Sequence, residues 1–146
     1  MRTIPLLLLL LGAASWAGEP FGVWKLNPTR STPAGNQKSV TARIEPHIRG
    51  EVFTLDTVAA DGRASTFSTI LYFDGKARDF QDSVCSGTQS SRRVDGQTVE
   101  ILRECARGGK IRLIRRAART GVLILEITEQ HADGRRSERR LVMERQ

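Results

Sequence analysis

Short segments in which apolar and polar residues alternate, separated by glycine-containing turns, fill the sequence from residue 40 to its end. Apolar side chains at every second position indicate β-strands with one buried face. Asp-Gly pairs favour tight hairpins, because these turns need a positive φ angle that glycine adopts without strain. One turn follows another after roughly a dozen residues, so the pattern predicts strands that pair with their neighbours in the chain. The turns are Asp61-Gly62, Asp74-Gly75, Asp95-Gly96, Gly108-Gly109, Thr120-Gly121 and Asp133-Gly134.

The expected fold is therefore all-β, an antiparallel up-and-down meander. A sheet with one apolar face must cover that face, and its edge strands must be paired or protected. Closure into a barrel of about eight or nine strands meets both needs, and a β-sandwich is the alternative. The segment at residues 28–38 contains two prolines and a glycine. These residues exclude a regular strand and predict a loop between the opening strand and the meander.

The first residues have the features of an export signal. Arg2 precedes an apolar run that is too short to span a bilayer, and small residues stand at Ser15 and Ala17 before Gly18. We therefore expect residues 1–17 to be a secretory signal peptide and residues 18–146 to form one domain. The mature protein is then soluble, and it is located in the periplasm or outside the cell.

Cys85 and Cys105 are the only cysteines of the chain. In an oxidising compartment two cysteines normally form one disulfide, which here closes a loop of about 20 residues. A catalytic role for either thiol is the weaker alternative, because neither cysteine belongs to a C-x-x-C motif.

The opening strand carries Gly22-x-Trp24. This motif, on the first strand of an all-β meander, resembles the G-x-W signature of lipocalins and fatty-acid-binding proteins, the calycin β-barrels. The resemblance implies that the indole closes one end of a barrel and that a late arginine stacks on it. Arg145 is favoured for this role over Arg139 and Arg140.

The chain also resembles small secreted lipocalin-like bacterial proteins, which begin G-x-W-K-L-N after a signal peptide and end in E-R-Q or similar. Here those letters stand at residues 22–27 and 144–146. Two calycin motifs have no counterpart, the T-D-Y of lipocalins and the R-x-Y with which fatty-acid-binding proteins hold a carboxylate. The resemblance therefore predicts the fold and leaves the ligand open.

Basic residues are concentrated in the second half of the chain. Residues 18–82 carry eight basic and eight acidic residues, whereas residues 83–146 carry fourteen and eight, with arginine making up nearly all of the excess. Arginine suits planar anions such as carboxylate and phosphate. The asymmetry suggests either an anion-binding interior or an outer basic patch that attracts the anionic cell envelope. The outer candidates are Arg112, Arg116, Arg135 and Arg136.

One hairpin places two arginines on an apolar face. With a turn at residues 107–109, Arg103 lies opposite Leu113 and Ile101 lies opposite Arg115, which keeps the apolar residues of both strands together. Arg103 and Arg115 then point to the interior, where a buried guanidinium needs a partner. A ligand carboxylate or phosphate is that partner in one interpretation. In the other, both arginines lie on the surface with their stems along apolar residues.

The sequence shows no set of side chains whose types and spacing suit catalysis. His47 falls on a polar strand face, His131 lies beside a turn, and no spacing of residues suits a metal. We therefore expect a non-catalytic protein that needs no metal or cofactor. Single-stranded nucleic acid would need aromatic residues among the charges, and none follows Phe80. Specific binding of nucleic acid is accordingly not expected.

The sequence thus predicts an exported, monomeric, basic protein that binds a small hydrophobic or amphipathic molecule. In its sharper form, this hypothesis places an acidic head group near Arg103 and Arg115. The alternative is an interaction module with a filled core, whose basic outer face binds a protein partner or the cell envelope. An open interior favours the first hypothesis and a packed interior the second. The interior candidates for ligand contact are Phe53, Leu71, Phe73, Leu123 and Leu125.

Overall fold

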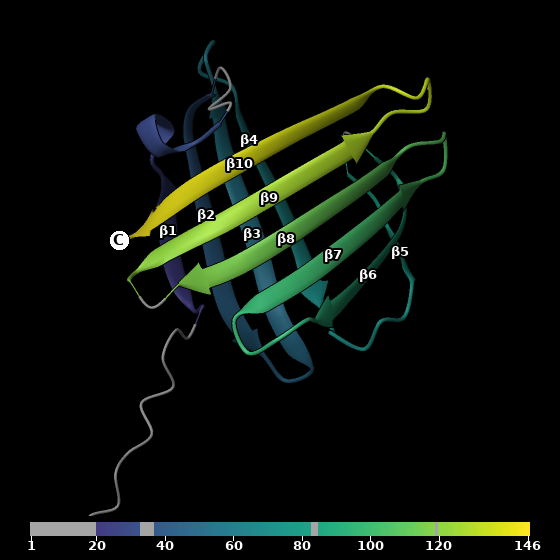
Figure 1. Cartoon of the computed structure of the whole chain (residues 1–146), viewed down its shortest axis with the longest axis horizontal. Helices are drawn as coiled ribbons and strands as arrows, with labels where there is room; N and C mark the ends of the chain where they lie inside the picture. Colours follow the sequence, from purple (N-terminus) through teal and green to yellow (C-terminus); the bar gives the residue numbers. More distant parts are fainter. Residues whose placement is uncertain (1–19, 33–36, 83–84, 119) are drawn as a thin grey trace, which may run out of the picture.

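The computed structural model describes residues 20–32, 37–82, 85–118 and 120–146 (Figure 1). The predicted signal peptide and residues 33–36 of the predicted loop lie outside the described residues. The described chain forms β-strands and one short 3-10 helix, η1. Their bounds are β1 Gly22–Leu26, η1 Pro28–Arg30, β2 Gln37–His47, β3 Gly50–Ala59, β4 Ala64–Leu71, β5 Arg78–Phe80, β6 Gly87–Arg93, β7 Thr98–Cys105, β8 Lys110–Ala118, β9 Val122–Gln130 and β10 Arg136–Arg145.

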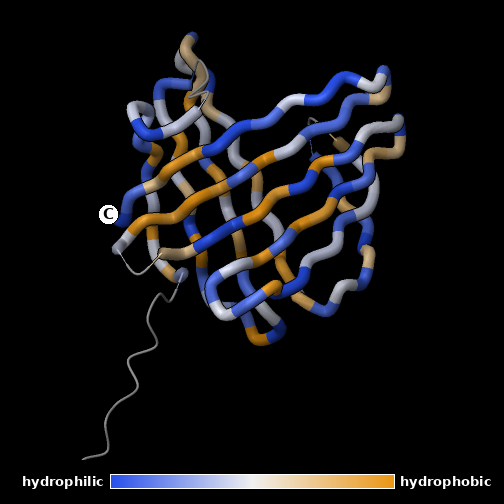
Figure 2. The backbone as a smooth tube through the Cα atoms, in the orientation of Figure 1, coloured by the Kyte–Doolittle hydropathy of each residue, from blue (hydrophilic) through white to orange (hydrophobic). Residues whose placement is uncertain are grey.

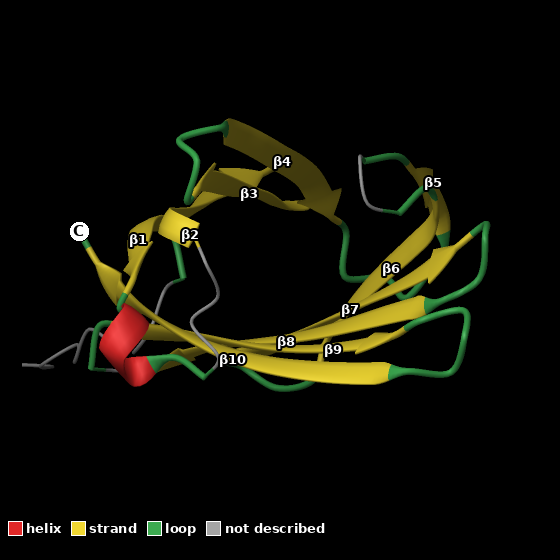
Figure 3. Cartoon of the chain, turned by 90° about the horizontal axis from the view of Figure 1, so that it is seen from above, coloured by secondary structure: helices red, strands yellow, loops and turns green. Residues whose placement is uncertain are grey.

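All the strands belong to one antiparallel sheet with the order β4-β3-β2-β1-β10-β9-β8-β7-β6-β5. Consecutive strands pair, except β4 and β5, and β1 pairs with β10 to join the two halves of the sheet. The sheet curls into a half-barrel whose end strands are β4 and β5 (Figure 3). The predicted all-β antiparallel meander is confirmed. Between β4 and β5, the described residues form no backbone ladder, so the wall has an open side.

The sheet has 10 strands, whereas the sequence predicted about eight or nine. The two short strands before β7 explain the difference. β5 has 3 residues and β6 reads GTQSSRR, so neither shows the apolar alternation that marks the other strands. They form strands because each pairs with a neighbour: β6 forms hydrogen bonds along the edge of β7, and β5 forms them along the edge of β6.

Two leaves of the curled sheet enclose the core. We call residues 21–75, with β1–β4, the aromatic leaf, and residues 87–145, with β6–β10, the arginine leaf. Along most strands hydrophobic and hydrophilic residues alternate (Figure 2), and the inward-facing apolar side chains form one cluster. Its buried members are Trp24, Leu26, Val40, Ala42, Ile44, Phe53, Leu71, Val99, Ile101, Ala117, Leu123, Leu125, Ile127, Leu141 and Met143.

The register of the β7–β8 hairpin differs from the predicted one by two residues. Arg103 lies opposite Ile111, and Arg115 lies opposite Val99. The turn closes between Cys105 and Gly109, whose backbone groups are bonded, and Gly108 and Gly109 both have positive φ. These glycines let the chain reverse one residue earlier than predicted. A shift of two residues keeps every side chain on its predicted face, so both arginines still point inward.

Candidate functional site

Trp24 and Arg145, which the resemblance predicted to stack on each other, are in contact. The Trp24 side chain is buried, and its indole N–H donates to the carbonyl oxygen of Pro20 at 2.9 Å. The Arg145 guanidinium lies over the indole, 4.3 Å from the ring centroid, and donates to the carbonyl oxygen of Phe21 at 2.7 Å. Gly22 has φ +131°, and a Cβ built there would come within 2.9 Å of the Arg145 guanidinium. The positive φ favours a glycine where the arginine crosses β1, because residues with a Cβ rarely adopt it.

A buried ion pair joins the two leaves through the core. Glu51 on β3 and Arg115 on β8 are 0% and 2% exposed, and their side chains are bonded at 2.5 Å. Arg93 approaches the other oxygen of Glu51 at 3.5 Å. Burial lowers the pKa of Arg115, and the charge of Glu51 opposes this shift. Arg115 thus faces the interior as predicted, but a protein carboxylate occupies the place that the sequence interpretation gave to a ligand.

Four of the five apolar residues predicted to line a ligand site belong to the close-packed core. These four residues are at most 1% exposed, and none lines one of the hollows described below. The fifth residue, Phe73, is half-buried, has φ 58°, and stacks under the Arg93 guanidinium at 4.2 Å. The core is therefore filled at these positions, which are Phe53, Leu71, Leu123 and Leu125.

Arg103 lies between two aromatic rings at the open side of the wall. Its guanidinium is 4.0 Å from the centroid of Phe67 on β4 and 4.6 Å from that of Phe80 on β5. It also donates to Gln89 at 2.9 Å and to Asp82 at 3.4 Å. Burial lowers the pKa of Arg103 to about 10, with Asp82 opposing the shift. Arg103 therefore remains a cation at neutral pH while it is largely withdrawn from water.

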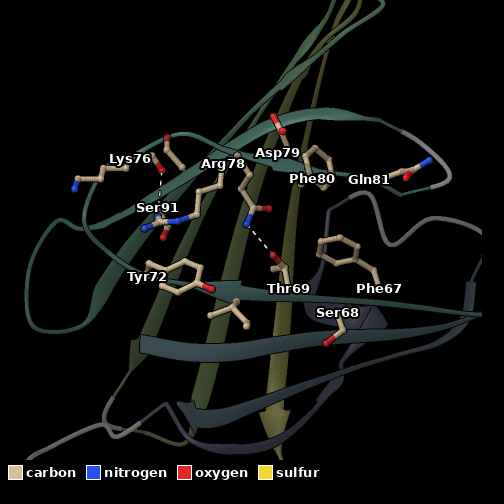
Figure 4. A pocket seen from close by; sticks show the side chains of 13 residues that line it. Phe67, Ser68, Thr69, Tyr72, Lys76, Arg78, Asp79, Phe80, Gln81 and Ser91 are labelled. Carbon is tan, nitrogen blue, oxygen red and sulfur yellow. Dashed lines mark hydrogen bonds between the residues drawn. The ribbon is translucent and has the colours of Figure 1, made fainter. Parts of the chain in front are cut away.

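A slot of about 410 Å³ opens between β4 and the β5–β6 pair, next to this arginine. Four consecutive residues of β4, at 67–70, form one side, and β5 and β6 form the other (Figure 4). A hydrogen bond of 2.8 Å from Gln89 to Thr69 crosses the slot. The full lining is Phe67, Ser68, Thr69, Ile70, Tyr72, Lys76, Arg78, Asp79, Phe80, Gln81, Gln89, Ser90 and Ser91.

One end of the slot is fixed by the segment that follows β4. The Phe73 N–H donates to the Ser91 hydroxyl at 3.1 Å, and the Gly75 N–H donates to the Ser91 carbonyl at 2.9 Å. Arg78 lies over the Tyr72 ring at 4.0 Å and holds Asp74 in a bidentate pair at 2.7 and 2.8 Å. Hydrogen bonds from Arg78 hold the pKa of Asp74 well below its usual range. This end is thus held by two hydrogen bonds from backbone N–H groups to Ser91 and by one charge-assisted pair.

Two further hollows lie elsewhere on the molecule. One of about 400 Å³ adjoins the Cys85–Cys105 disulfide and the turns after β7 and β9. The other, of about 480 Å³, lies on β7–β10 beside Leu102, Lys110 and Arg112. The disulfide is the one that the sequence predicted, and its sulfur atoms join residues 20 positions apart.

The outer arginines that were candidates for a basic patch are each paired with a carboxylate. Charges paired in this way attract distant anions less strongly than free ones. Glu100, only 4% exposed, holds Arg92 and Arg112 at 2.6 and 2.7 Å. The remaining pairs are Arg116–Glu126 at 3.2 Å, Arg135–Asp133 at 2.6 Å and Arg136–Glu138 at 2.6 Å.

The two histidines belong to different hairpins. His47 ends β2 and accepts a hydrogen bond from the Arg49 N–H, whereas His131 belongs to the turn between β9 and β10. Within the described ranges, no three His, Cys, Asp or Glu side chains are grouped as metal ligands would be. In the same ranges, no helix has the length and apolar character needed to cross a bilayer.

Comparison with known proteins gives a match in structure but not in sequence. No protein-family model and no curated protein sequence matches the chain. The fatty acid binding protein of Schistosoma mansoni, solved in complex with arachidonic acid, matches with a TM-score of 0.57 and 11% identity. The match covers 92% of this chain and 99% of that protein. At this identity the likeness shows the fold alone, and that fold is calycin-like. The resemblance to secreted bacterial proteins stays a prediction.

The sequence patterns considered above did not include the buried position of Glu51 or most of the residues that line the slot. Glu51, Phe53 and Leu55 stand at every second position of one strand. The two-residue alternation therefore predicts that Glu51 points to the same side as the two apolar residues. The slot residues gave no such signal, because β5 and β6 are polar and the slot exists only where β4 comes near them.

Proposed function

We propose that the protein binds a small amphipathic molecule in the slot between β4 and the β5–β6 pair, without catalysing a reaction on it. The slot carries this proposal: about 410 Å³ lined by aromatic rings, hydroxyls and two cationic side chains. Ligand sites are typically concave, partly apolar and equipped with a few polar groups, and this volume lies in their usual range. The fold shared with a fatty acid binding protein is a further support.

An anionic head group is the form of the ligand that the charges favour. Arg103 does not line the slot, but it touches Phe67, Phe80 and Gln89, which do. The Arg103 guanidinium is largely withdrawn from water, and such a cation attracts a nearby anion more strongly than an exposed cation does. Both interior arginines have a carboxylate partner, but Asp82 lies 3.4 Å from Arg103, whereas Glu51 lies 2.5 Å from Arg115 and offsets its charge more fully.

We further propose that the protein works outside the cytoplasm as a monomer. Residues 1–17 have the pattern of a cleaved signal peptide. The disulfide between Cys85 and Cys105 fits an oxidising compartment. The alternative, an interaction module acting through its basic outer face, is less favoured because the outer arginines named above are paired with carboxylates.

The test uses Tyr72, the single tyrosine of the chain, which lines the slot. Fluorotyrosine is incorporated at Tyr72, and fluorine NMR follows a titration with dodecanoate, with dodecanol as the uncharged comparison. We expect a saturable shift of the Tyr72 signal by dodecanoate and a weaker effect of dodecanol.

Two matched variants locate the binding. Ile70→Glu places a negative charge in the slot and should weaken dodecanoate binding about tenfold or more. Leu102→Glu makes the same kind of change beside the hollow on the outer face of β7 and should leave binding unchanged. No saturable binding in wild type, or equal losses in both variants, would contradict the proposal. Binding of anionic vesicles without dodecanoate binding would favour the interaction module.

A further inference from the structure

The β4 edge lacks the usual protection of an edge strand. Strand β4, Ala64–Leu71, lies at one end of the sheet and reads ASTFSTIL, without a charged residue or a proline. Edge strands of soluble proteins are normally short, charged, bulged or interrupted by proline, because an open edge pairs with other chains. The 8 residues of β4 form a continuous ladder with β3. Their other side is therefore a regular edge that can accept a strand.

The slot is bordered by backbone edges on both sides. In the part of the chain that the structure describes, β4 has a ladder with β3 alone and β5 has one with β6 alone. Each end strand directs a row of peptide N–H and C=O groups away from its ladder. A hydrocarbon chain cannot bond to these groups, whereas a peptide strand has donors and acceptors along both of its sides.

The lining of the slot also suits alternating side chains. Phe67 and Thr69 belong to the inner face of β4, and Ser68 and Ile70 belong to the outer face, yet all four line the slot. The slot thus passes through the wall instead of lying on one face of it. An extended peptide directs successive side chains to opposite faces, so it would place them alternately toward the core and toward solvent.

We infer that the occupant of the slot is an extended peptide segment that pairs with the free edge of β4. This inference rests on one part of the proposed function, that the slot binds a ligand, and it assigns a peptide as that ligand. The peptide adds a strand to the sheet, a mode of recognition in which main-chain bonds supply affinity and alternate side chains supply specificity. About four peptide residues can lie along the lining residues at 67–70. The Gln89–Thr69 hydrogen bond gives way to the new ladder, while Gln89 keeps its bond to Arg103.

The experiment is hydrogen–deuterium exchange of the full mature chain with a capped hexapeptide of alternating threonine and valine. We expect saturable protection of the β4 amides, with exchange slowed about tenfold or more. Two isomeric peptides, N-methylated at the odd or at the even amides, keep the side chains but lose the donors of one side. At least one of them should lose the protection. Equal protection by all three peptides would overturn strand pairing.

Two further arms separate this inference from the proposed function. Ser68→Lys charges the β4 edge and should weaken peptide binding about tenfold, whereas Ser137→Lys, an exposed site on β10, should not. If dodecanoate shifts the Tyr72 signal but no peptide protects β4, the inference fails and the proposed function stands. If neither probe binds, both fail.

Discussion

The two leaves of the half-barrel have complementary compositions. The aromatic leaf carries Trp24, Phe53, Phe67 and Phe73, whereas no aromatic residue occurs after Phe80. The arginine leaf carries most of the basic excess of the chain. Figure 1 shows the strands of the two leaves crossing at an angle, with the core between them.

The structure shows how this difference in composition produces contacts between the leaves. Arginines of one leaf lie on rings of the other, with Arg93 on Phe73, Arg115 near Phe53 and Arg145 on Trp24. A guanidinium over a ring is worth about 0.5–2 kcal/mol, more when it is withdrawn from water. The leaves are therefore joined by cations on rings and by one buried ion pair, in addition to the β1–β10 ladder and apolar packing. Arg145 and Trp24 lie opposite each other in that ladder, whereas Arg115 and Glu51 meet across the core.

The largest expected effect comes from breaking the buried pair between the leaves. Arg115→Met leaves Glu51 without its closest cation, and we expect the free energy of unfolding to fall by about 3–5 kcal/mol. Urea denaturation measures this loss. Replacing both residues, as Glu51→Leu with Arg115→Met, should recover much of it, because two apolar side chains leave no buried charge.

The matched control is Arg116→Met on the same strand. Its partner Glu126 is 40% exposed and lies 3.2 Å away, so the loss should stay below about 1 kcal/mol. If Arg115→Met costs no more than Arg116→Met, the pair does not hold the leaves together.

The next effect tests the disulfide that ties Cys85, which precedes the arginine leaf, to β7. Cys85→Ser with Cys105→Ser removes a disulfide that spans 20 positions, and the free energy of unfolding should fall by about 3 kcal/mol. Wild-type protein unfolded in a reducing agent should match the double variant. A loss well below 1 kcal/mol would show that the disulfide contributes little to the stability of the fold.

A smaller effect is expected where Arg145 lies over Trp24. Arg145→Met removes the cation from Trp24 and the bond to Phe21, which should cost about 1–2 kcal/mol in the free energy of unfolding. The fluorescence of Trp24, the single tryptophan after residue 17, should change with it. Arg140→Met, at an exposed position of the same strand, should alter neither quantity. If Arg145→Met and Arg140→Met behave identically, the contact of Arg145 with Trp24 does not help to join the leaves.

The smallest effect is a pH dependence within the arginine leaf. Burial acts to raise the pKa of Glu100, but hydrogen bonds from Arg92 and Arg112 outweigh it and lower the pKa below its ordinary value. A carboxyl group whose pKa is lower in the folded state stabilises the fold above its unfolded pKa, and this contribution is lost as the pH falls through the folded value. Glu100→Gln should therefore be less stable than wild type at pH 7.

Urea denaturation across the acid range checks this prediction. The difference between Glu100→Gln and wild type should be about 1 kcal/mol at neutral pH and should shrink as the pH falls below the ordinary value of 4.5 for glutamate. A difference that stays constant with pH would mean that charge on Glu100 does not stabilise this leaf.

Much of the architecture was predictable because it follows from local patterns. Alternation along Val40, Ala42 and Ile44 fixes which face of a strand is buried, and these three residues are buried. Alternation has a period of two, so even a hairpin register wrong by two residues placed Arg103 and Arg115 on the correct face. Polar strands such as β6 carry no such signal, which explains the strand count.

The sequence by itself determined the strand faces, most of the hairpins and the uneven distribution of aromatic and basic residues. Only the tertiary structure decided what the interior arginines meet. Glu51 lies 64 positions before Arg115, and no local pattern specifies a contact between strands that far apart. The slot between β4 and the β5–β6 pair likewise depends on the tertiary structure. It depends on how far the sheet curls before its two end strands approach each other, and that curl is set by the packing of the whole core.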